Sequence, residues 1–99
     1  MEFPSKKDFD IMLKGVRSSH NIIVQTISKH AYERSKKRNF KPEDIKNILE
    51  NYARYKAGNT NNPNSYKYFD AQDNAIILGN DGIILTVIGG QTNGSFEQN

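Results

Sequence analysis

The sequence predicts an α+β fold, with N-terminal helices packed on a three- to four-stranded antiparallel β-meander. Apolar residues in the first half recur at helical spacing, whereas the second half holds short β-branched and aromatic segments separated by turn signals. Strands that follow helices in this order are typical of α+β proteins. Because 99 residues are the length of one domain, we expect a single domain over residues 1–99. Its core is expected over residues 26–90, followed by a disordered tail over residues 91–99.

Three helices are expected in the first half of the chain. The first covers residues 6–17, and its apolar face has the spacing i, i+3, i+4, i+7, at Phe9, Met12, Leu13 and Val16. The second covers residues 29–38, with Ser28 as its N-cap. The third covers residues 42–52 and begins at Pro42, whose fixed φ suits the first position of a helix. Its apolar face repeats the same spacing, at Ile45, Ile48, Leu49 and Tyr52.

Three strands are expected in the second half, over residues 66–70, 74–78 and 83–88, with a further edge strand over residues 54–56. The Asn-Asp-Gly turn before the last strand is a strong hairpin signal. The last strand is apolar on both faces except for one threonine, which predicts a central position in the sheet. Residues 22–27 are apolar and β-branched, and their pattern fits a helix as well as a strand.

The composition excludes several kinds of function. The chain has no cysteine and only two histidines, so it offers no disulfide, no thiolate nucleophile and no zinc site made of cysteines. We expect no metal and no small-molecule cofactor. No apolar run approaches a membrane span, and the N-terminus lacks the apolar region of a signal peptide, so we expect no membrane partner. The net charge of +3 favours nucleic acid or an acidic protein as partner.

The positive charge is concentrated in residues 28–41. This stretch holds six Lys and Arg residues and one acid, a net charge of +5, whereas the whole chain carries +3. Within it His30 precedes Arg34 by four residues, so both side chains lie on one face of the expected helix, where we expect them to be exposed. An imidazole beside a guanidinium is suited to contacting a phosphodiester. His20, in a Ser-Ser-His-Asn break, is expected to be an exposed loop residue.

Four short motifs occur in an order that is similar to that of a known family. They are His30-Ala31-Tyr32-Glu33-Arg34, Arg38-Asn39-Phe40, Pro42-Glu43-Asp44-Ile45 and Leu85-Thr86-Val87-Ile88. In these motifs the chain resembles a family of small bacterial domains with a His-Ala-x-x-Arg helix start, over residues 26–90. That family is similar to the superfamily of barnase, EndoU, colicin D and RelE-like ribonucleases. The superfamily supplies toxin–antitoxin toxins and the C-terminal toxin domains of contact-dependent growth inhibition and polymorphic toxin systems.

The resemblance implies a metal-independent ribonuclease toxin. Such enzymes cleave RNA, often tRNA, by attack of the 2′-hydroxyl on the adjacent phosphate, which leaves a 2′,3′-cyclic phosphate. The matching positions imply catalytic roles for His30, as base or acid, for Arg34 and for Thr86. Tyr68 is a further candidate, because its hydroxyl can donate to a phosphate oxygen and its ring can stack on a base. Four further cations of the patch are candidates for RNA binding, namely Lys29, Lys36, Lys37 and Arg38.

The resemblance also implies a partner and a site of action. An acidic immunity protein or antitoxin would neutralise the toxin, most simply by presenting carboxylates to the basic site. The toxin would act in the bacterial cytoplasm, either delivered from another cell within a larger secreted effector or kept under an antitoxin in its own cell. Two alternatives use the same patch without catalysis. One is a module that binds RNA or DNA through phosphates, and the other is a docking surface for an acidic protein.

Overall fold

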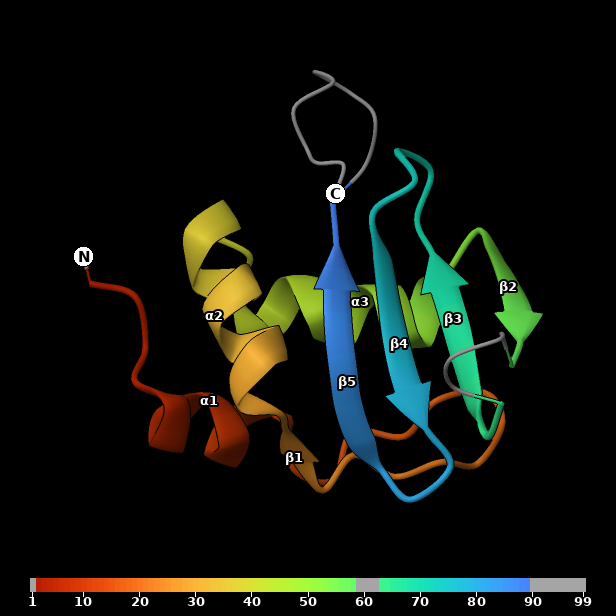
Figure 1. The fold of residues 1–99 in the computed structure, drawn as a ribbon, viewed down its shortest axis with the longest axis horizontal. Helices are drawn as coiled ribbons and strands as arrows, with labels where there is room; N and C mark the ends of the chain where they lie inside the picture. The colour runs from red at the N-terminus through yellow and green to blue at the C-terminus, as the bar shows by residue number, and fades with distance from the viewer. Residues whose placement is uncertain (1, 59–62, 90–99) are drawn as a thin grey trace.

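The structure is a computed structural model that describes residues 2–58 and 63–89. In chain order its elements are α1 (Lys6–Leu13), β1 (Thr26–Ile27), α2 (Lys29–Arg38), α3 (Pro42–Asn51), β2 (Arg54–Ala57), β3 (Ser65–Phe69), β4 (Ala75–Gly79) and β5 (Ile83–Ile88). The predicted α+β class is confirmed, with helices packed on a mostly antiparallel sheet (Figure 1). The sheet has five strands in the described part of the chain, rather than three or four. The expected tail, residues 91–99, lies outside the described residues.

The first helix is shorter than predicted. Helix α1 is capped by the hydroxyl of Ser5 and ends at Leu13. Gly15 then takes a left-handed φ of 91°, and its amide donates to the carbonyl of Val24 (2.9 Å) instead of continuing the helix. Val16 is buried as expected, but it does not belong to the helix. It lies in the segment after α1, which makes a short antiparallel contact with the segment before β1. The apolar spacing therefore included one residue that lies beyond the helix.

Helices α2 and α3 begin where their capping residues predict. The Ser28 hydroxyl accepts a hydrogen bond from the Ala31 amide (3.0 Å), and α2 ends at Asn39, which adopts a left-handed φ of 58°. Helix α3 begins at Pro42. The Asp44 carboxylate accepts a hydrogen bond (2.9 Å) from the backbone amide that precedes this helix. Helix α3 ends one residue before its predicted end.

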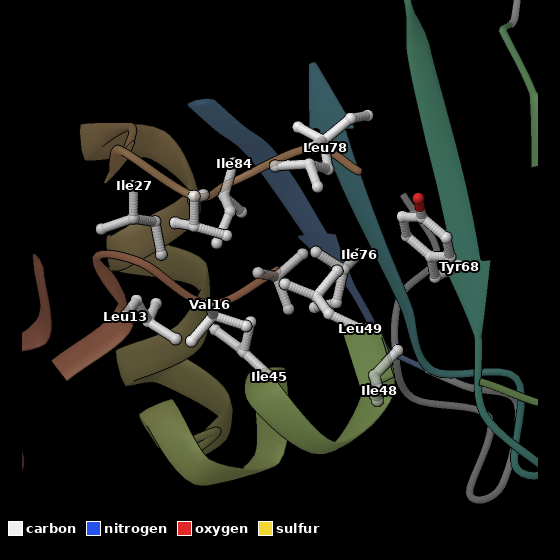
Figure 2. Close-up of a cluster of buried hydrophobic side chains, with 14 of the residues drawn as sticks. Leu13, Val16, Ile27, Ile45, Ile48, Leu49, Tyr68, Ile76, Leu78 and Ile84 are labelled. Carbon is white, nitrogen blue, oxygen red and sulfur yellow. The ribbon is translucent and has the colours of Figure 1, made fainter. Parts of the chain in front are cut away.

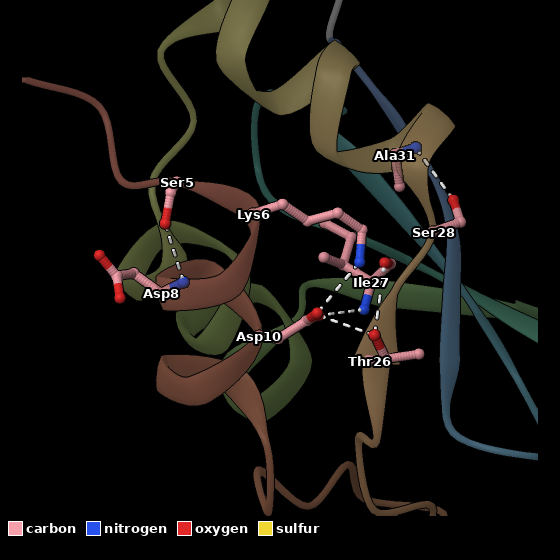
Figure 3. Close-up of polar contacts among 8 residues, drawn as sticks. All are labelled: Ser5, Lys6, Asp8, Asp10, Thr26, Ile27, Ser28 and Ala31. Carbon is pink, nitrogen blue, oxygen red and sulfur yellow. Dashed lines mark hydrogen bonds and ion pairs between the residues drawn. The ribbon is translucent and has the colours of Figure 1, made fainter.

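A carboxylate on α1 fixes this helix to the first strand (Figure 3). Asp10 accepts hydrogen bonds from the Ile27 amide and the Thr26 hydroxyl, each at 2.8 Å, and pairs with the Lys6 ammonium at 3.0 Å. Burial raises the pKa of Asp10, but the bonds from Ile27, Thr26 and Lys6 outweigh burial and leave the pKa below its ordinary value of 3.8. The folded structure therefore favours the ionised form of Asp10, and the bonds of this carboxylate hold α1 against β1.

The strand order is β1-β5-β4-β3-β2. Strands β2 to β5 form the predicted antiparallel meander, and β2 is the expected edge strand. Strand β5 lies inside the sheet, as predicted, because β4 pairs with it on one side and β1 pairs with it in parallel on the other, where β1 forms the second edge. The ambiguous residues 22–27 thus end in a strand of only two residues, Thr26 and Ile27. Such a strand is too short for periodicity to reveal it.

One face of the sheet, the core face, packs against the helices, of which α2 lies along β5 and α3 along β3 and β4 (Figure 2). Apolar side chains from all three helices and from four strands are buried together there, including Leu13, Ile27, Ala31, Ile45, Ile48, Leu49, Tyr68, Ile76, Leu78 and Ile84. Each leucine or isoleucine among them contributes about 1.5–3 kcal/mol relative to leaving it exposed. This packing fixes which side of every strand faces inward, and hence which side faces outward.

The opposite face of the sheet is the outer face. Lys67, Ile77 and Thr86 are paired in a row across β3, β4 and β5, and residues directly opposite one another share a face. Arg54 and Lys56 of β2 pair with β3 residues of the same face. No helix that the structure describes covers the outer face, which is turned toward the viewer in Figure 1 with α3 behind the strands.

A turn at Asp70 sets the register between β3 and β4. The Asp70 carboxylate accepts hydrogen bonds from the amides of Gln72 and Asn74 and from the Asn74 side chain, each at 2.9 Å. Asp73 takes a left-handed φ of 66° within this turn. Asp70 and Asn74 therefore belong to the turn and not, as predicted, to the flanking strands.

Candidate nucleic-acid interface

The side of α2 that carries His30 faces away from α1. Tyr32 packs against Phe9 of α1, with ring centroids 5.5 Å apart. His30 precedes Tyr32 by two positions, about 200° around the helix, and so points in nearly the opposite direction. The side chain of His30 is exposed, as predicted, and forms no hydrogen bond or ion pair with a residue that the structure describes.

Arg34 is anchored to the last strand. Its Nε donates to the carbonyl of Val87 (2.9 Å), so the side chain is half-buried rather than exposed as predicted. Its two terminal amino groups form no hydrogen bond within residues 2–58 and 63–89, and they remain available to a ligand. Thr86, the neighbour of Val87, is half-buried on the outer face. The bond to Val87 thus holds the His30 side of α2 beside the strand that carries Thr86.

Tyr68 does not join this group. It is fully buried (0 % exposed) on the core face, where it pairs with Ile76, which in turn pairs with Val87. Thr86 projects from the other face, so the sheet itself separates the two side chains. The period of two along a strand is the reason, since it places neighbouring residues on opposite faces. Lys67, and not Tyr68, shares the face of Thr86.

The four cations predicted to bind RNA are distributed around α2. Lys29, Lys36 and Lys37 are exposed, and Arg38 is half-buried. At about 100° per residue, Lys37 lies on the side of His30, whereas Lys29 and Lys36 lie together on the side of α2 that faces away from the sheet. One RNA strand can meet Lys37 and His30 together, but Lys29 and Lys36 form a separate surface.

The outer face carries three further cations that were missed among the predicted site residues. Arg54 and Lys56 flank Tyr55 in β2, and Lys67 lies between Tyr66 and Tyr68 in β3. The alternation of basic and aromatic residues in the sequence could have indicated these cations. A period of two along a strand places the basic side chains on one face and the tyrosines on the other. Arg54, Lys56 and Lys67 are called the strand cations below.

His20 is not the exposed loop residue that the sequence predicts. It lies at the tip of the hairpin between α1 and β1, it is half-buried, and its ring stacks on Tyr66 with centroids 4.0 Å apart. A hydrogen bond of 2.8 Å joins its Nδ1 to the Tyr68 hydroxyl. Tyr55 meets the imidazole edge-on at 4.5 Å. No local pattern indicates these contacts, since Tyr68 is 48 residues further along the chain.

The His20–tyrosine cluster consists of His20, Tyr52, Tyr55, Tyr66 and Tyr68. Tyr52 extends the cluster, because its hydroxyl forms a hydrogen bond of 2.8 Å with the hydroxyl of Ser19. Burial raises the pKa of Tyr68, and the neighbouring tyrosines raise it further, although a hydrogen bond with Ser18 acts in the opposite direction. The Tyr68 hydroxyl is therefore protonated at neutral pH. The cluster holds the hairpin against β3. The imidazole of His20 and the hydroxyls of Tyr52 and Tyr68 already form hydrogen bonds within the protein.

Comparison of the chain with family models gives no match, and neither does comparison with curated proteins or with solved structures. Among the described residues, no group of three or more His, Cys, Asp and Glu side chains could hold a metal ion. None of the helices in this part of the chain has the length and apolar character to cross a bilayer. Function is therefore inferred from the sequence motifs and from the geometry of the side chains.

Proposed function

We propose that the protein is a metal-independent ribonuclease whose catalytic residues are His30, Arg34 and Thr86. Four sequence motifs support the proposal, and one contact carries it. The hydrogen bond from Arg34 Nε to the Val87 carbonyl (2.9 Å) holds the basic side of α2 against β5, the strand that carries Thr86, and this contact between two distant segments supports a shared site. His30 on this side of α2 has no partner among the described residues, and an imidazole can transfer a proton near neutral pH.

The proposed reaction is a transesterification within the RNA backbone. The 2′-hydroxyl oxygen loses its proton and bonds to the adjacent phosphorus, while the bond from phosphorus to the 5′-oxygen breaks and that oxygen gains a proton. The products are a 2′,3′-cyclic phosphate and a 5′-hydroxyl. His30 acts as base or acid in this exchange. The terminal amino groups of Arg34 are suited to bidentate contact with the non-bridging oxygens, and the Thr86 hydroxyl can donate one more hydrogen bond.

The proposed substrate is tRNA, and the proposed role is that of a toxin. Both depend on the resemblance of the motifs to those of ribonuclease toxins. An acidic immunity protein or antitoxin is the proposed neutralising partner, because the cations of α2 and of the outer face would attract its carboxylates. The proposed site of action is the bacterial cytoplasm, reached by delivery from another cell or by synthesis in the same cell together with an antitoxin.

A second candidate function is RNA binding without cleavage. Lys29 and Lys36 favour it, because they are exposed cations on a side of α2 that does not include His30. A module of this kind would bind through phosphates, with a steep dependence on salt concentration. It would need no proton transfer, so substitution of His30 would have little effect on it.

Incubation with total tRNA in the presence of EDTA tests the proposal. We expect the wild-type protein to produce discrete fragments that end in a 2′,3′-cyclic phosphate, and His30→Ala to produce none while remaining folded. Lys7→Ala is the control, since Lys7 is an exposed residue of α1, and it should cleave like the wild type. Binding of tRNA without cleavage by the wild type would support the second candidate. Neither cleavage nor binding would indicate a docking surface for an acidic protein.

A further inference from the structure

Two lysines on the outer face are held directly opposite each other. Lys56 of β2 pairs with Lys67 of β3 in the antiparallel register, so their Cβ atoms are about 5 Å apart. Like charges in such positions destabilise a sheet. Neither ammonium group forms a hydrogen bond or an ion pair with a residue in the described ranges, 2–58 and 63–89. The fold therefore maintains a pair of like charges, and no described carboxylate pairs with either of them.

Arg54 adds a third positive charge beside this pair. Its guanidinium carbon lies 3.8 Å from the centre of the Phe69 ring, and its Nη2 pairs with Asp73 at 2.8 Å. The Lys67 ammonium lies 5.2 Å from the centre of the same ring, so the ring positions both cations. Burial lowers the pKa of the half-buried Lys67, and the charges of Lys56 and Arg54 lower it further. The three cations are thus close enough to affect one another.

We propose that the strand cations, Arg54, Lys56 and Lys67, form a binding site for phosphate groups of a single-stranded RNA backbone. An anion placed between the two lysines removes their mutual repulsion, which a neutral ligand cannot do. The choice of RNA rests on the proposed function, because Lys67 shares the outer face with Thr86 across Ile77. Two strand spacings, about 10 Å, separate Lys67 from Thr86. An RNA whose scissile phosphate lies at Thr86 reaches the strand cations with a phosphate further along its chain.

The chemistry of this site suits phosphates rather than bases. Phe69, an aromatic residue of the outer face, is only 8 % exposed and is covered by Arg54, so it offers no open ring for stacking. The tyrosines of β2 and β3 project to the core face instead. Contacts to phosphates position an RNA but do not read its sequence. We therefore expect the strand cations to affect affinity and not the choice of the cleaved bond.

Salt-dependent binding tests this site without relying on cleavage. Every sample carries His30→Ala, and the probe is a short, labelled, single-stranded RNA. Each lost phosphate contact reduces the slope of log affinity against log salt by about 0.7, which corresponds to a roughly fivefold loss of affinity at about 0.1 M salt. Lys67→Gln and Lys56→Gln should each show this reduction. Lys7→Gln, at an exposed position on α1, removes the same charge and should leave the slope unchanged.

Thermal unfolding provides a second readout that needs no RNA. Removal of one of the opposed charges should raise the Tm of the free protein. Inorganic pyrophosphate, used as the probe anion, should raise the Tm of the wild type more than that of Lys67→Gln. Because Lys56 is exposed, Lys56→Gln allows the binding test even if Lys67→Gln does not fold.

Two results would overturn the inference. One is an unchanged salt slope in Lys56→Gln and in any folded Lys67→Gln protein. The other is a loss of affinity for an acidic peptide with RNA binding unchanged, which would assign the strand cations to an acidic protein. If the proposed ribonuclease function is wrong but the binding site is right, the experiments give a different pattern of results. In that case the wild type does not cleave tRNA, yet the salt slope still falls in the lysine variants.

Discussion

The two histidines of the chain have opposite surroundings. His20 is stacked on Tyr66 and hydrogen-bonded to Tyr68, whereas His30 is exposed and has no hydrogen-bond or ion-pair partner among the described residues. Groups whose hydrogen bonds are formed within the protein stabilise the fold. Groups that remain open to solvent on a basic surface are available to a ligand. In this chain the environment, and not the residue type, separates a histidine that supports the structure from one that can react.

Replacement of His30 should have the largest effect and should fall entirely on activity. We expect His30→Gln to slow tRNA cleavage by about 10²–10⁴-fold, the usual contribution of a general acid or base. The free energy of unfolding should change by less than about 0.5 kcal/mol, because the side chain is exposed. Single-turnover cleavage and urea unfolding measure the two quantities. Normal cleavage with a large loss of stability would reverse the roles assigned to the two histidines.

Replacement of His20 should give the complementary result. His20→Ala removes the stacking on Tyr66 and leaves the buried Tyr68 hydroxyl without its imidazole partner. We expect a loss of about 2–3 kcal/mol in the free energy of unfolding, measured by urea denaturation. Cleavage per folded molecule should be unchanged. A loss of cleavage greater than the unfolded fraction explains would show that His20 takes part in the reaction.

Deletion of single hydroxyl groups sharpens the comparison within the His20–tyrosine cluster. Tyr68→Phe should cost about 1–2 kcal/mol, because it removes the 2.8 Å hydrogen bond to the His20 Nδ1 and leaves that nitrogen only the longer contact of 3.5 Å with the Ser19 hydroxyl. Tyr55→Phe is the matched control. Tyr55 is 48 % exposed, and its hydroxyl forms no hydrogen bond among the described residues, so its loss should cost less than about 0.5 kcal/mol. Equal effects in thermal denaturation would mean that ring packing alone holds His20 in place.

Asp10 should show the smallest effect, and it extends the comparison to a charged group whose partners lie within the fold. Because the pKa of Asp10 in the folded protein is below its ordinary value of 3.8, its contribution to stability is complete above that pH. The contribution is lost as the pH falls through the lower, folded-state pKa. Asp10→Asn should cost no more than about 1 kcal/mol at neutral pH, since the side chain is partly solvated.

The pH dependence of urea unfolding measures this contribution. The difference in stability between the wild type and Asp10→Asn should shrink as the solution is acidified below pH 3.8, the ordinary value for this carboxyl. A difference that stays constant through the acid range would mean that the charge of Asp10 does not contribute.

The helices and most strands could be predicted because their signals are local. Ser28 and Pro42 mark the starts of α2 and α3, and the Asn-Asp-Gly turn marks the hairpin before β5. Strand β1 could not be predicted, because its two residues are defined only by parallel pairing with β5. The end of α1 was also missed, because Gly15 leaves the helix to bond with Val24, a residue from the next segment.

The candidate site was predictable only in part. The spacing of His30 and Arg34 on one helical face is a local property, but the bond from Arg34 to Val87 joins residues that are 53 positions apart. Tyr68 was placed with Thr86 although alternation along β3 puts it on the core face. The same alternation, if applied to Lys67, indicates the strand cations. Periodicity therefore contained more information about the outer face than the choice of reactive residue types did.

The Asp70 turn has a consequence for how this domain can evolve. Strand β3 alternates Tyr66, Lys67 and Tyr68, and its register against β4 is set by the bonds of one carboxylate. A slip of a single position would exchange the two sides of the strand, driving an ammonium group into the hydrocarbon interior and presenting phenol rings to water. Insertions in the Asp70 turn should therefore be strongly selected against. Substitutions that preserve the geometry of the turn leave the lysine and the tyrosines of β3 on their present faces.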